Sequence, residues 1–267
     1  SRDNLPRIFG SGIKKTIDGG ATWTTATITG IAATSFTQGS LRLKPGNPDV
    51  IYASTATKIY KSTDAGATFT ATGTGFPFAP QSGRTIIDVT AANPEVVYCL
   101  KSTNNNTFQG LYKSINGGTS YVNTGLTAAG IDVIDGGTQA WYDLALCVSQ
   151  TDENEVYTGL LNVWKSSNGG ATATKLNSWS SWSPNFTHAD IHFLQYFGNK
   201  LYCGSDGGIY VSTDKGVTFN DIIGQAQIGQ FYKISVSKQS ASKITGGLQD
   251  NGGFIYNNNL WRDYHGG

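Results

Sequence analysis

A short phrase recurs five times along this chain of 267 residues, and it constrains the fold more than any other feature. Its clearest copy runs from Lys61 to Phe69 and reads Lys-Ser-Thr-Asp-Ala-Gly-Ala-Thr-Phe. The acidic or amide residue of each copy lies 46, 52, 52 and 46 residues after the previous one, at Asp18, Asp64, Asn116, Asn168 and Asp214. A repeat of this period indicates an array of similar structural units.

Each copy of the phrase predicts a tight turn between two strands. Asp and Asn side chains accept hydrogen bonds from backbone amides that follow them, and glycine supplies a positive φ angle. The aromatic residue that ends the phrase can pack back over the turn. We therefore expect the five Asp and Asn residues to hold these turns and to have no chemical role.

Two further strands precede each turn. Polar segments such as 47–49 and 93–95 are followed by β-rich runs, and a further apolar segment comes before each of them, at 41–44, 86–90, 145–149 and 191–196. One repeat thus contains four antiparallel strands, which is typical of a propeller blade. No long segment has a 3.6-residue period, so almost no helix is expected.

The ends of the sequence continue the same pattern. Residues 6–28 are interpreted as the last three strands of one blade, and residues 230–264 as a sixth blade whose turn phrase has degenerated. The sequence therefore predicts an all-β propeller of about six four-stranded antiparallel blades, in a single domain over 1–267. Because the chain has no Met and begins at Ser1, we expect it to be a piece of a longer chain whose ring could hold more blades.

Composition argues against some classes of partner. Charged residues make up 14% of the chain, the net charge is +1 and the basic residues are scattered, so no nucleic-acid footprint is expected. No apolar run is long enough for a membrane span. The three cysteines, each inside a predicted strand, are expected to be buried core residues without a disulfide framework: Cys99, Cys147 and Cys203.

The repeated phrase, Ser-x-Asp-x-Gly-x-Thr followed by Trp or Phe, resembles the Asp-box, also called the BNR repeat. Asp-boxes occur in sialidases, in xyloglucan-degrading glycosidases, in sortilin-type receptor propellers and in many secreted bacterial propellers. The resemblance spans residues 15–219 and implies a propeller. It implies little about activity, because the box lies on outer strands, away from the site of the enzymes that carry it.

Four segments near the end of the chain are similar to large sortilin-like BNR proteins of the Bacteroidota: 188–192, 204–208, 228–232 and 246–252. Those proteins are commonly secreted to the cell surface, often by the type IX system. The resemblance implies a secreted or cell-surface location.

His188, Asp190 and His192 alternate along the chain and are expected to project from one face of a strand near the central channel. Two imidazoles and a carboxylate on one face could bind a divalent metal ion. The alternative is a hydrogen-bonded polar cluster between blades. No other cofactor is expected.

Asp206 and Asp250 occupy equivalent loops between the second and third strands of two blades. In the xyloglucan-degrading enzymes that the box resembles, aspartates in such loops act as acid and base, and an inverting pair stands roughly 6.5–9.5 Å apart. The alternative is that both aspartates only hold turns before glycine. A sialidase needs three arginines around the substrate carboxylate and a nucleophile pair of Tyr and Glu. It is not expected, because the chain has only five arginines and its three glutamates lie in turn segments.

Three tryptophans, Trp141, Trp179 and Trp182, lie in or near links between blades. Exposed tryptophan would suit stacking on a sugar or binding of a protein, whereas a folded-over loop would bury it. The leading hypothesis is a non-catalytic extracellular recognition or scaffold module, with a glycan, a protein ligand or secretion machinery as partner. The alternatives are a xyloglucanase-like glycoside hydrolase and passenger cargo of a type IX system, so whether the chain is an enzyme stays open.

Overall fold

The computed structural model describes residues 12–30, 40–77, 83–180, 184–224, 231–248 and 252–265. They belong to two compact units, Ser1–Asp221 and Ile222–Gly267. All regular secondary structure in the described ranges is β, as predicted, and none of their segments is a helix that could cross a membrane.

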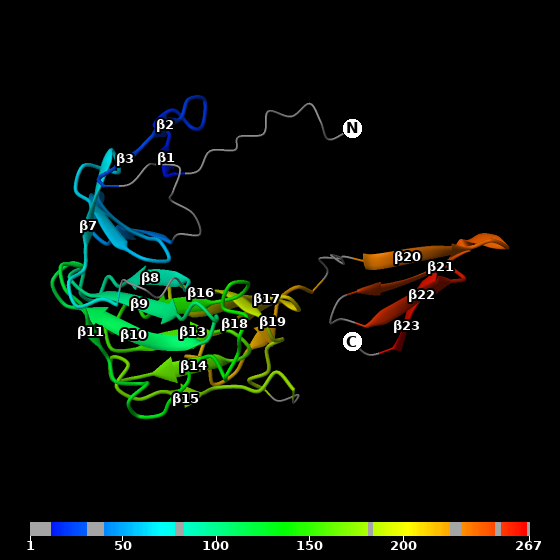
Figure 1. Cartoon of the computed structure of the whole chain (residues 1–267). Helices are drawn as coiled ribbons and strands as arrows, with labels where there is room; N and C mark the ends of the chain where they lie inside the picture. The colour runs from blue at the N-terminus through cyan, green and yellow to red at the C-terminus, as the bar shows by residue number, and fades with distance from the viewer. Residues whose placement is uncertain are drawn as a thin grey trace. The chain divides into compact units, whose positions relative to one another are not determined.

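In each four-stranded sheet the strands follow one another in chain order and are antiparallel (Figure 1). The first unit contains the short pair β1 (Lys14–Lys15) and β2 (Thr24–Thr25), followed by four sheets. These are β4 (Leu41–Lys44), β5 (Asn47–Ser54), β6 (Ile59–Ser62) and β7 (Thr68–Thr72); β8 (Thr85–Val89), β9 (Val97–Ser102), β10 (Phe108–Ser114) and β11 (Val122–Asn123); β12 (Ala145–Val148), β13 (Val156–Gly159), β14 (Val163–Ser166) and β15 (Thr174–Lys175); and β16 (Ile191–Phe197), β17 (Lys200–Ser205), β18 (Gly208–Ser212) and β19 (Asn220–Asp221). The second unit is one sheet of β20 (Phe231–Ser237), β21 (Ser240–Leu248), β22 (Gly253–Asn257) and β23 (Leu260–His265).

The predicted positions of the first strands agree with β4, β8, β12 and β16 to within one residue at each end. The expected last blade is present as the four-stranded sheet β20–β23. At the start of the chain, described residues 12–28 form β1 and β2, while β3 (Thr27–Ile28) pairs in parallel with β7 and makes the sheet of β4–β7 five-stranded. Residues 6–11, part of the expected first blade, lie outside the described residues.

Apolar layers between successive sheets form the core of the first unit. Tyr52 and Ile59 pack against Ile87, Val97 and Cys99 across one such boundary. Equivalent layers lie between the β8–β11 and β12–β15 sheets and between the β12–β15 and β16–β19 sheets. Removal of this apolar surface from water is the main force that holds the sheets together. The three cysteines are free thiols buried in these layers, which confirms their predicted place.

Backbone hydrogen bonds also join one sheet to the next. The Thr27 amide donates to the Ala67 carbonyl at 2.9 Å, and the Tyr121 amide donates to the Thr74 carbonyl at 2.8 Å. In each case the segment that leaves one sheet pairs with the residues just after the turn of the following sheet. The sheets are therefore linked through the outer strands as well as through the core.

All five repeated phrases form the same turn. Ser62 Oγ accepts the Gly66 amide at 2.9 Å and donates to Asp64 Oδ1 at 2.8 Å, while Asp64 accepts both the amide and the hydroxyl of Thr68, at 2.8 and 2.6 Å. The same Ser or Thr and Asp or Asn contacts recur at Asp18, Asn116, Asn168 and Asp214. The residue after the Asp or Asn has a positive φ in every copy, which explains why glycine stands there in three of the five.

The lysine that begins the phrase connects neighbouring blades. Lys61 lies over the Tyr52 ring, 5.7 Å from its centroid, and donates to the Gly117 carbonyl in the next turn at 2.8 Å. Lys113 lies over Tyr98 in the same way, at 5.4 Å. A cation over an aromatic face is stabilised by the ring quadrupole, so this contact orients the lysine side chain toward the next blade.

Candidate functional site

Several of the singled-out residues meet where β12 and β16 begin. His192 Nε2 lies 2.7 Å from Asp206 Oδ1, and the Tyr142 hydroxyl donates to Asp206 Oδ2 at 3.0 Å. The rings of Tyr142 and His192 meet edge to face, with centroids 4.7 Å apart. Asp206, in the turn between β17 and β18, therefore holds a tyrosine from one blade and a histidine from the next.

Trp141 precedes this tyrosine and is 63% exposed, and Tyr142 is 42% exposed. The two ring centroids are 5.6 Å apart. Trp141, Tyr142, His192 and Asp206 are called the aromatic site below. It presents an apolar ring surface beside a hydrogen-bonded carboxylate, the combination that binds a sugar ring and its hydroxyls.

A second polar group lies beside the aromatic site. Gln139 Nε2 donates to Asp190 Oδ1 and, at 3.1 Å, to Asp143 Oδ2. Asp143 is completely buried, and its Oδ1 has no hydrogen-bond partner among the described residues. Burial raises the pKa of Asp143 to about 6, although the hydrogen bond from Gln139 opposes the shift. This carboxyl can therefore keep a proton in mildly acidic solution.

The local chain explains how these side chains come together. The turn at 139–143 is closed by the Tyr142 and Asp143 amides, which both donate to the Gln139 carbonyl. The Ile191 amide donates to the Leu160 carbonyl at 2.6 Å and fixes the start of β16 against the preceding blade. The bond between Gln139 and Asp190 then joins the segment before β12 to the segment before β16.

A hollow of about 240 Å³ lies between the innermost strands of four sheets. Its lining comes from β4, β8, β12 and β16 and includes Ser40, Arg42, Arg84, Leu144 and His192. Because His192 belongs to both, this hollow, called the channel pocket below, adjoins the aromatic site.

The prediction that His188, Asp190 and His192 project from one strand is wrong. β16 begins at Ile191, and Asp190 has a φ of 62°, which breaks the extended alternation that the prediction required. The His188 side chain instead packs beside Gly207, where an added Cβ would stand 2.3 Å from the histidine Cβ. Within the described parts of the chain, no three His, Cys, Asp or Glu residues are grouped so that they could hold a metal ion.

The other singled-out residues are placed as follows. Asp206 lies between the second and third strands, as expected. Its carboxylate bonds to Tyr142 and His192, which belong to other segments of the chain. Asp250 and Trp182 lie outside the described residues. Trp179, on the link that follows β15, is 49% exposed.

Sequence reasoning missed Gln139, Tyr142, Asp143 and Arg84. A usable signal was present, because the polar segment 139–143 precedes β12 just as 188–190 precedes β16. Equivalent segments of adjacent blades lie side by side, so polar residues in both could have been considered together.

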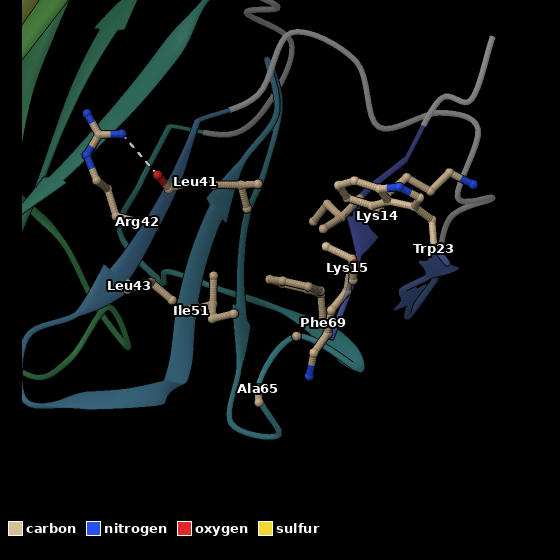
Figure 2. A pocket seen from close by; sticks show the side chains of 12 residues that line it. Lys14, Lys15, Trp23, Leu41, Arg42, Leu43, Ile51, Ala65 and Phe69 are labelled. Carbon is tan, nitrogen blue, oxygen red and sulfur yellow. Dashed lines mark hydrogen bonds between the residues drawn. The ribbon is translucent and has the colours of Figure 1, made fainter. Parts of the chain in front are cut away.

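A different hollow, of about 350 Å³, separates the β1–β2 hairpin from the sheet β4–β7. Trp23, Leu41, Ile51 and Phe69 line it, with Lys14 and Lys15 at its border (Figure 2). Its lining has no carboxyl group, and none of the residues singled out for chemistry lies there. It is therefore a weaker candidate than the aromatic site.

No protein-family model matches the chain, and no curated protein is similar to it. Among solved structures, an ancestral GH74 enzyme is 15% identical with a TM-score of 0.55, and the match covers 95% of this chain and 36% of that enzyme. YCF48 bound to D1 peptide is 13% identical with a TM-score of 0.49, covering 94% of this chain and 74% of that one. PorZ, a surface component of the type-IX secretion system of Porphyromonas gingivalis, is 14% identical with a TM-score of 0.45, covering 85% and 27%.

The match to the ancestral GH74 enzyme shows the fold. The chain is an all-β propeller protein built of four-stranded antiparallel sheets, as the repeat predicts. It spans about a third of the length of the GH74 enzyme. A shared fold at such low identity does not carry activity from one protein to another.

Proposed function

We propose that this chain is a non-catalytic recognition propeller of a secreted or cell-surface protein, and that it binds a saccharide at the aromatic site. The observation that carries the proposal is the exposed Trp141 beside Tyr142, with Asp206 held in place by a tyrosine and a histidine. A sugar ring stacks on an exposed indole, and a fixed carboxylate accepts hydrogen bonds from its hydroxyl groups.

The contacts around the carboxylate suit it to hold a ligand. Both oxygens of Asp206 lie within hydrogen-bond distance of the Tyr142 hydroxyl, and one also contacts His192. An ionised carboxylate has about four acceptor positions, so these two partners fix the orientation of Asp206 and leave acceptors for the hydroxyl groups of a sugar.

The extracytoplasmic location rests on the resemblance to sortilin-like BNR proteins of the Bacteroidota. Two of the segments that carry the resemblance, 188–192 and 204–208, supply His192 and Asp206 to this site. A role in a type IX secretion pathway, as component or cargo, belongs to the same proposal.

A glycoside hydrolase is the second candidate, and one observation favours it. A general acid must hold its proton near the working pH, and burial raises the pKa of Asp143 to about 6. In this candidate Asp143 is the acid and Asp206 the base.

The test is a panel of plant and bacterial oligosaccharides measured by calorimetry and by release of reducing ends. We expect binding without hydrolysis, and Trp141→Ala should weaken it roughly tenfold because a stacking contact is lost. Trp179→Ala, which removes a similarly exposed indole from a different link, is the matched control and should bind like the unaltered chain.

Unchanged binding by Trp141→Ala would contradict the proposed site. Release of reducing ends that disappears in both Asp143→Asn and Asp206→Asn would replace recognition with the hydrolase.

A further inference from the structure

Two arginines line the channel pocket, one from each of two inner strands. Arg42 lies on β4, and Arg84 immediately precedes β8. The pocket also contains Ser40 and His192, so its polar groups converge from three sheets on a volume of about 240 Å³. This space equals roughly eight water molecules at about 30 Å³ each, enough for a small polar group and part of one ring.

Arg84 has donors to spare. Its Nη1 donates to the Tyr142 carbonyl at 3.1 Å and to the Ala140 carbonyl at 3.5 Å. Its Nε and Nη2 have no hydrogen-bond partner among the described residues, and Arg84 forms no ion pair with them. A guanidinium group carries five N–H donors, so water or a ligand must take up the remainder.

The charge of Arg42 is neutralised by an ion pair, whereas the charge of Arg84 is balanced only in part. Arg42 Nε lies 2.8 Å from Asp88 Oδ1, and its Nη1 donates to the Leu41 carbonyl at 3.0 Å (Figure 2). Burial lowers the pKa of Arg84, and the charge of Asp143, whose own pKa is raised to about 6, opposes this shift. The pocket therefore keeps an excess of positive charge at its Arg84 side in mildly acidic solution.

The two carbonyls that Arg84 holds belong to the residues on either side of Trp141. The guanidinium group is therefore bonded to the backbone of the same turn that presents the indole. A ligand ring lying on Trp141 would therefore lie beside the turn to which this arginine is bonded.

We propose that the saccharide recognised at the aromatic site is acidic, and that its carboxylate binds in the channel pocket to Arg84. The inference rests on the proposed function and names the class of sugar. The planar, forked guanidinium group matches a carboxylate in two parallel hydrogen bonds, and burial of the group strengthens them. Arg42 adds its Nη2, which bonds to none of the described residues, from β4.

The experiment compares one oligosaccharide in two forms, a glucuronate-containing chain and the same chain after its carboxyl groups are reduced to alcohols. Calorimetry with the whole chain should show the acidic form binding at least tenfold more tightly, because a hydrogen bond to a charged group is lost on reduction. Arg84→Gln should abolish this preference while the neutral form binds as before. Arg262→Gln, which alters an arginine on β23 of the other unit, is the matched control and should keep the preference.

The outcomes separate the two claims. Equal binding of both forms by the unaltered chain overturns the acidic-sugar inference and leaves saccharide recognition standing. No binding of either form overturns the proposed function and this inference with it. Competition by inorganic phosphate that is much stronger than competition by acetate overturns the assignment of a carboxylate.

Loss of the Arg84 contacts to the 140–142 turn can also affect folding, so the thermal midpoint is measured for each variant. Arg84→Lys keeps the charge and removes the fork. It should reduce the preference for the acidic form severalfold, and an unchanged preference in a folded Arg84→Lys protein contradicts the proposal.

Discussion

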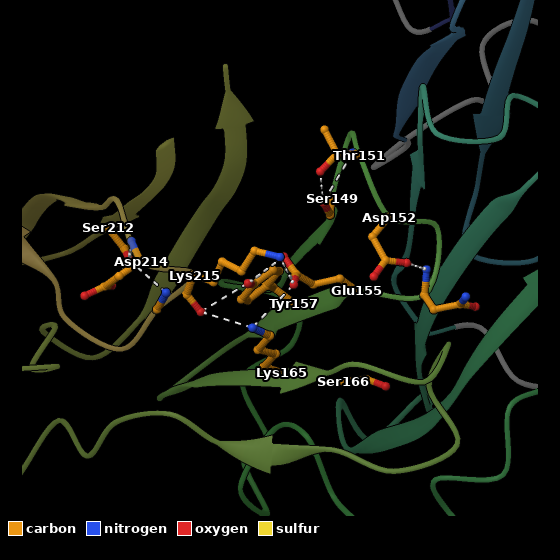
Figure 3. Close-up of polar contacts among 12 residues, drawn as sticks. Ser149, Thr151, Asp152, Glu155, Tyr157, Lys165, Ser166, Ser212, Asp214 and Lys215 are labelled. Atoms are coloured by element: carbon orange, nitrogen blue, oxygen red, sulfur yellow. Dashed lines mark hydrogen bonds and ion pairs between the residues drawn. The ribbon is translucent and has the colours of Figure 1, made fainter. Parts of the chain in front are cut away.

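Lys215 donates a hydrogen bond of 2.9 Å to the carboxylate of Glu155, which belongs to the preceding blade (Figure 3). The other oxygen of Glu155, Oε1, accepts the hydroxyls of Tyr157 and Tyr196, at 3.0 and 3.1 Å. Lys165 Nζ lies 3.5 Å from Oε2, the oxygen that Lys215 contacts. Lys165 also donates to the Lys215 carbonyl. This cluster, centred on the buried Glu155, joins the turn phrase of one blade to the turn before β13 in the preceding blade.

Replacement of Glu155 by Gln should lower the free energy of unfolding by about 2 kcal/mol, because charged hydrogen bonds are lost in a buried place. Denaturant unfolding measures the change. Glu153→Gln is the matched control, since Glu153 lies in the same turn with a longer contact to Lys113 of 3.9 Å, and it should cost less than about 1 kcal/mol. Equal losses in the two variants would contradict a special role for the cluster.

The same cluster predicts a dependence on pH. Burial alone would raise the pKa of Glu155, but the hydrogen bond from Lys215 and the charge of Lys165 hold it below its ordinary value of 4.5. The unfolded chain therefore takes up the proton first, and the stabilisation, complete above that value, is lost as the pH falls through and below it. The difference in unfolding free energy between the unaltered chain and Glu155→Gln should shrink on acidification. A constant difference across this range would refute the assignment.

Asp64→Asn should change thermal stability little, whereas Asp64→Ala should lower the thermal midpoint clearly. The amide oxygen of Asn116 accepts the same backbone amide bond in its own turn, at 2.9 Å, so asparagine can close the turn and alanine cannot.

The hydrogen bonds from Thr68 lower the pKa of Asp64 to about 2, so its contribution is present above the ordinary value of 3.8 and lost as the pH falls toward 2. Thermal melts at neutral pH and at pH about 2 test both statements, and equal midpoints for the Asn and Ala variants at neutral pH would contradict the first.

Lys101 is buried and donates to the Ala56 carbonyl at 2.8 Å. Burial lowers its pKa from 10.5 to about 8, so between these values the folded chain binds fewer protons than the unfolded chain. Stability due to this group should therefore rise as the pH increases through that window. Relative to Lys101→Met, the unaltered chain should gain unfolding free energy between pH about 8 and about 10, and a falling difference would show that the lysine is not desolvated.

Asp88 joins three sheets through two contacts. Its Oδ1 pairs with Arg42 of β4 at 2.8 Å, and its Oδ2 accepts the Val148 amide of β12 at 2.7 Å. Arg42→Ala leaves this buried carboxylate without its cation and should cost more than Asp88→Asn, which keeps the acceptor for Val148. A double-mutant cycle should give a coupling of about 1 to 3 kcal/mol. Lys44→Ala, on the same strand but paired with the exposed Glu95, is the control, and a coupling near zero for Arg42 and Asp88 would rule the bridge out.

The fold was predictable because its information is local and repeated. The contacts of the turn at Asp64 join residues no more than four positions apart, so the phrase itself contains the donors and acceptors that close it. The first strands, such as β4 and β12, follow from apolar runs between polar turns. The parallel pairing of β3 with β7 was not predicted, because it depends on how the leaving segment meets the next sheet.

The candidate site was predicted only in part. Trp141, His192 and Asp206 were singled out separately, but the sequence grouped His192 with His188 and Asp190 on one strand. The positive φ of Asp190 ends that alternation, and no pattern of residue types indicates it. The partners of Asp206 lie 14 and 64 residues away along the chain, at His192 and Tyr142.

By itself the sequence determined the all-β repeat, the order of the four antiparallel strands within a repeat and the turns, since these depend on hydrogen bonds and apolar alternation within a few residues. Only the tertiary structure decided that Tyr142, His192 and Asp206 meet, and that Arg84 lines the channel pocket while it bonds to the turn around Trp141. These contacts join adjacent blades, and packing of one sheet's apolar face on the next sets which side chains face each other.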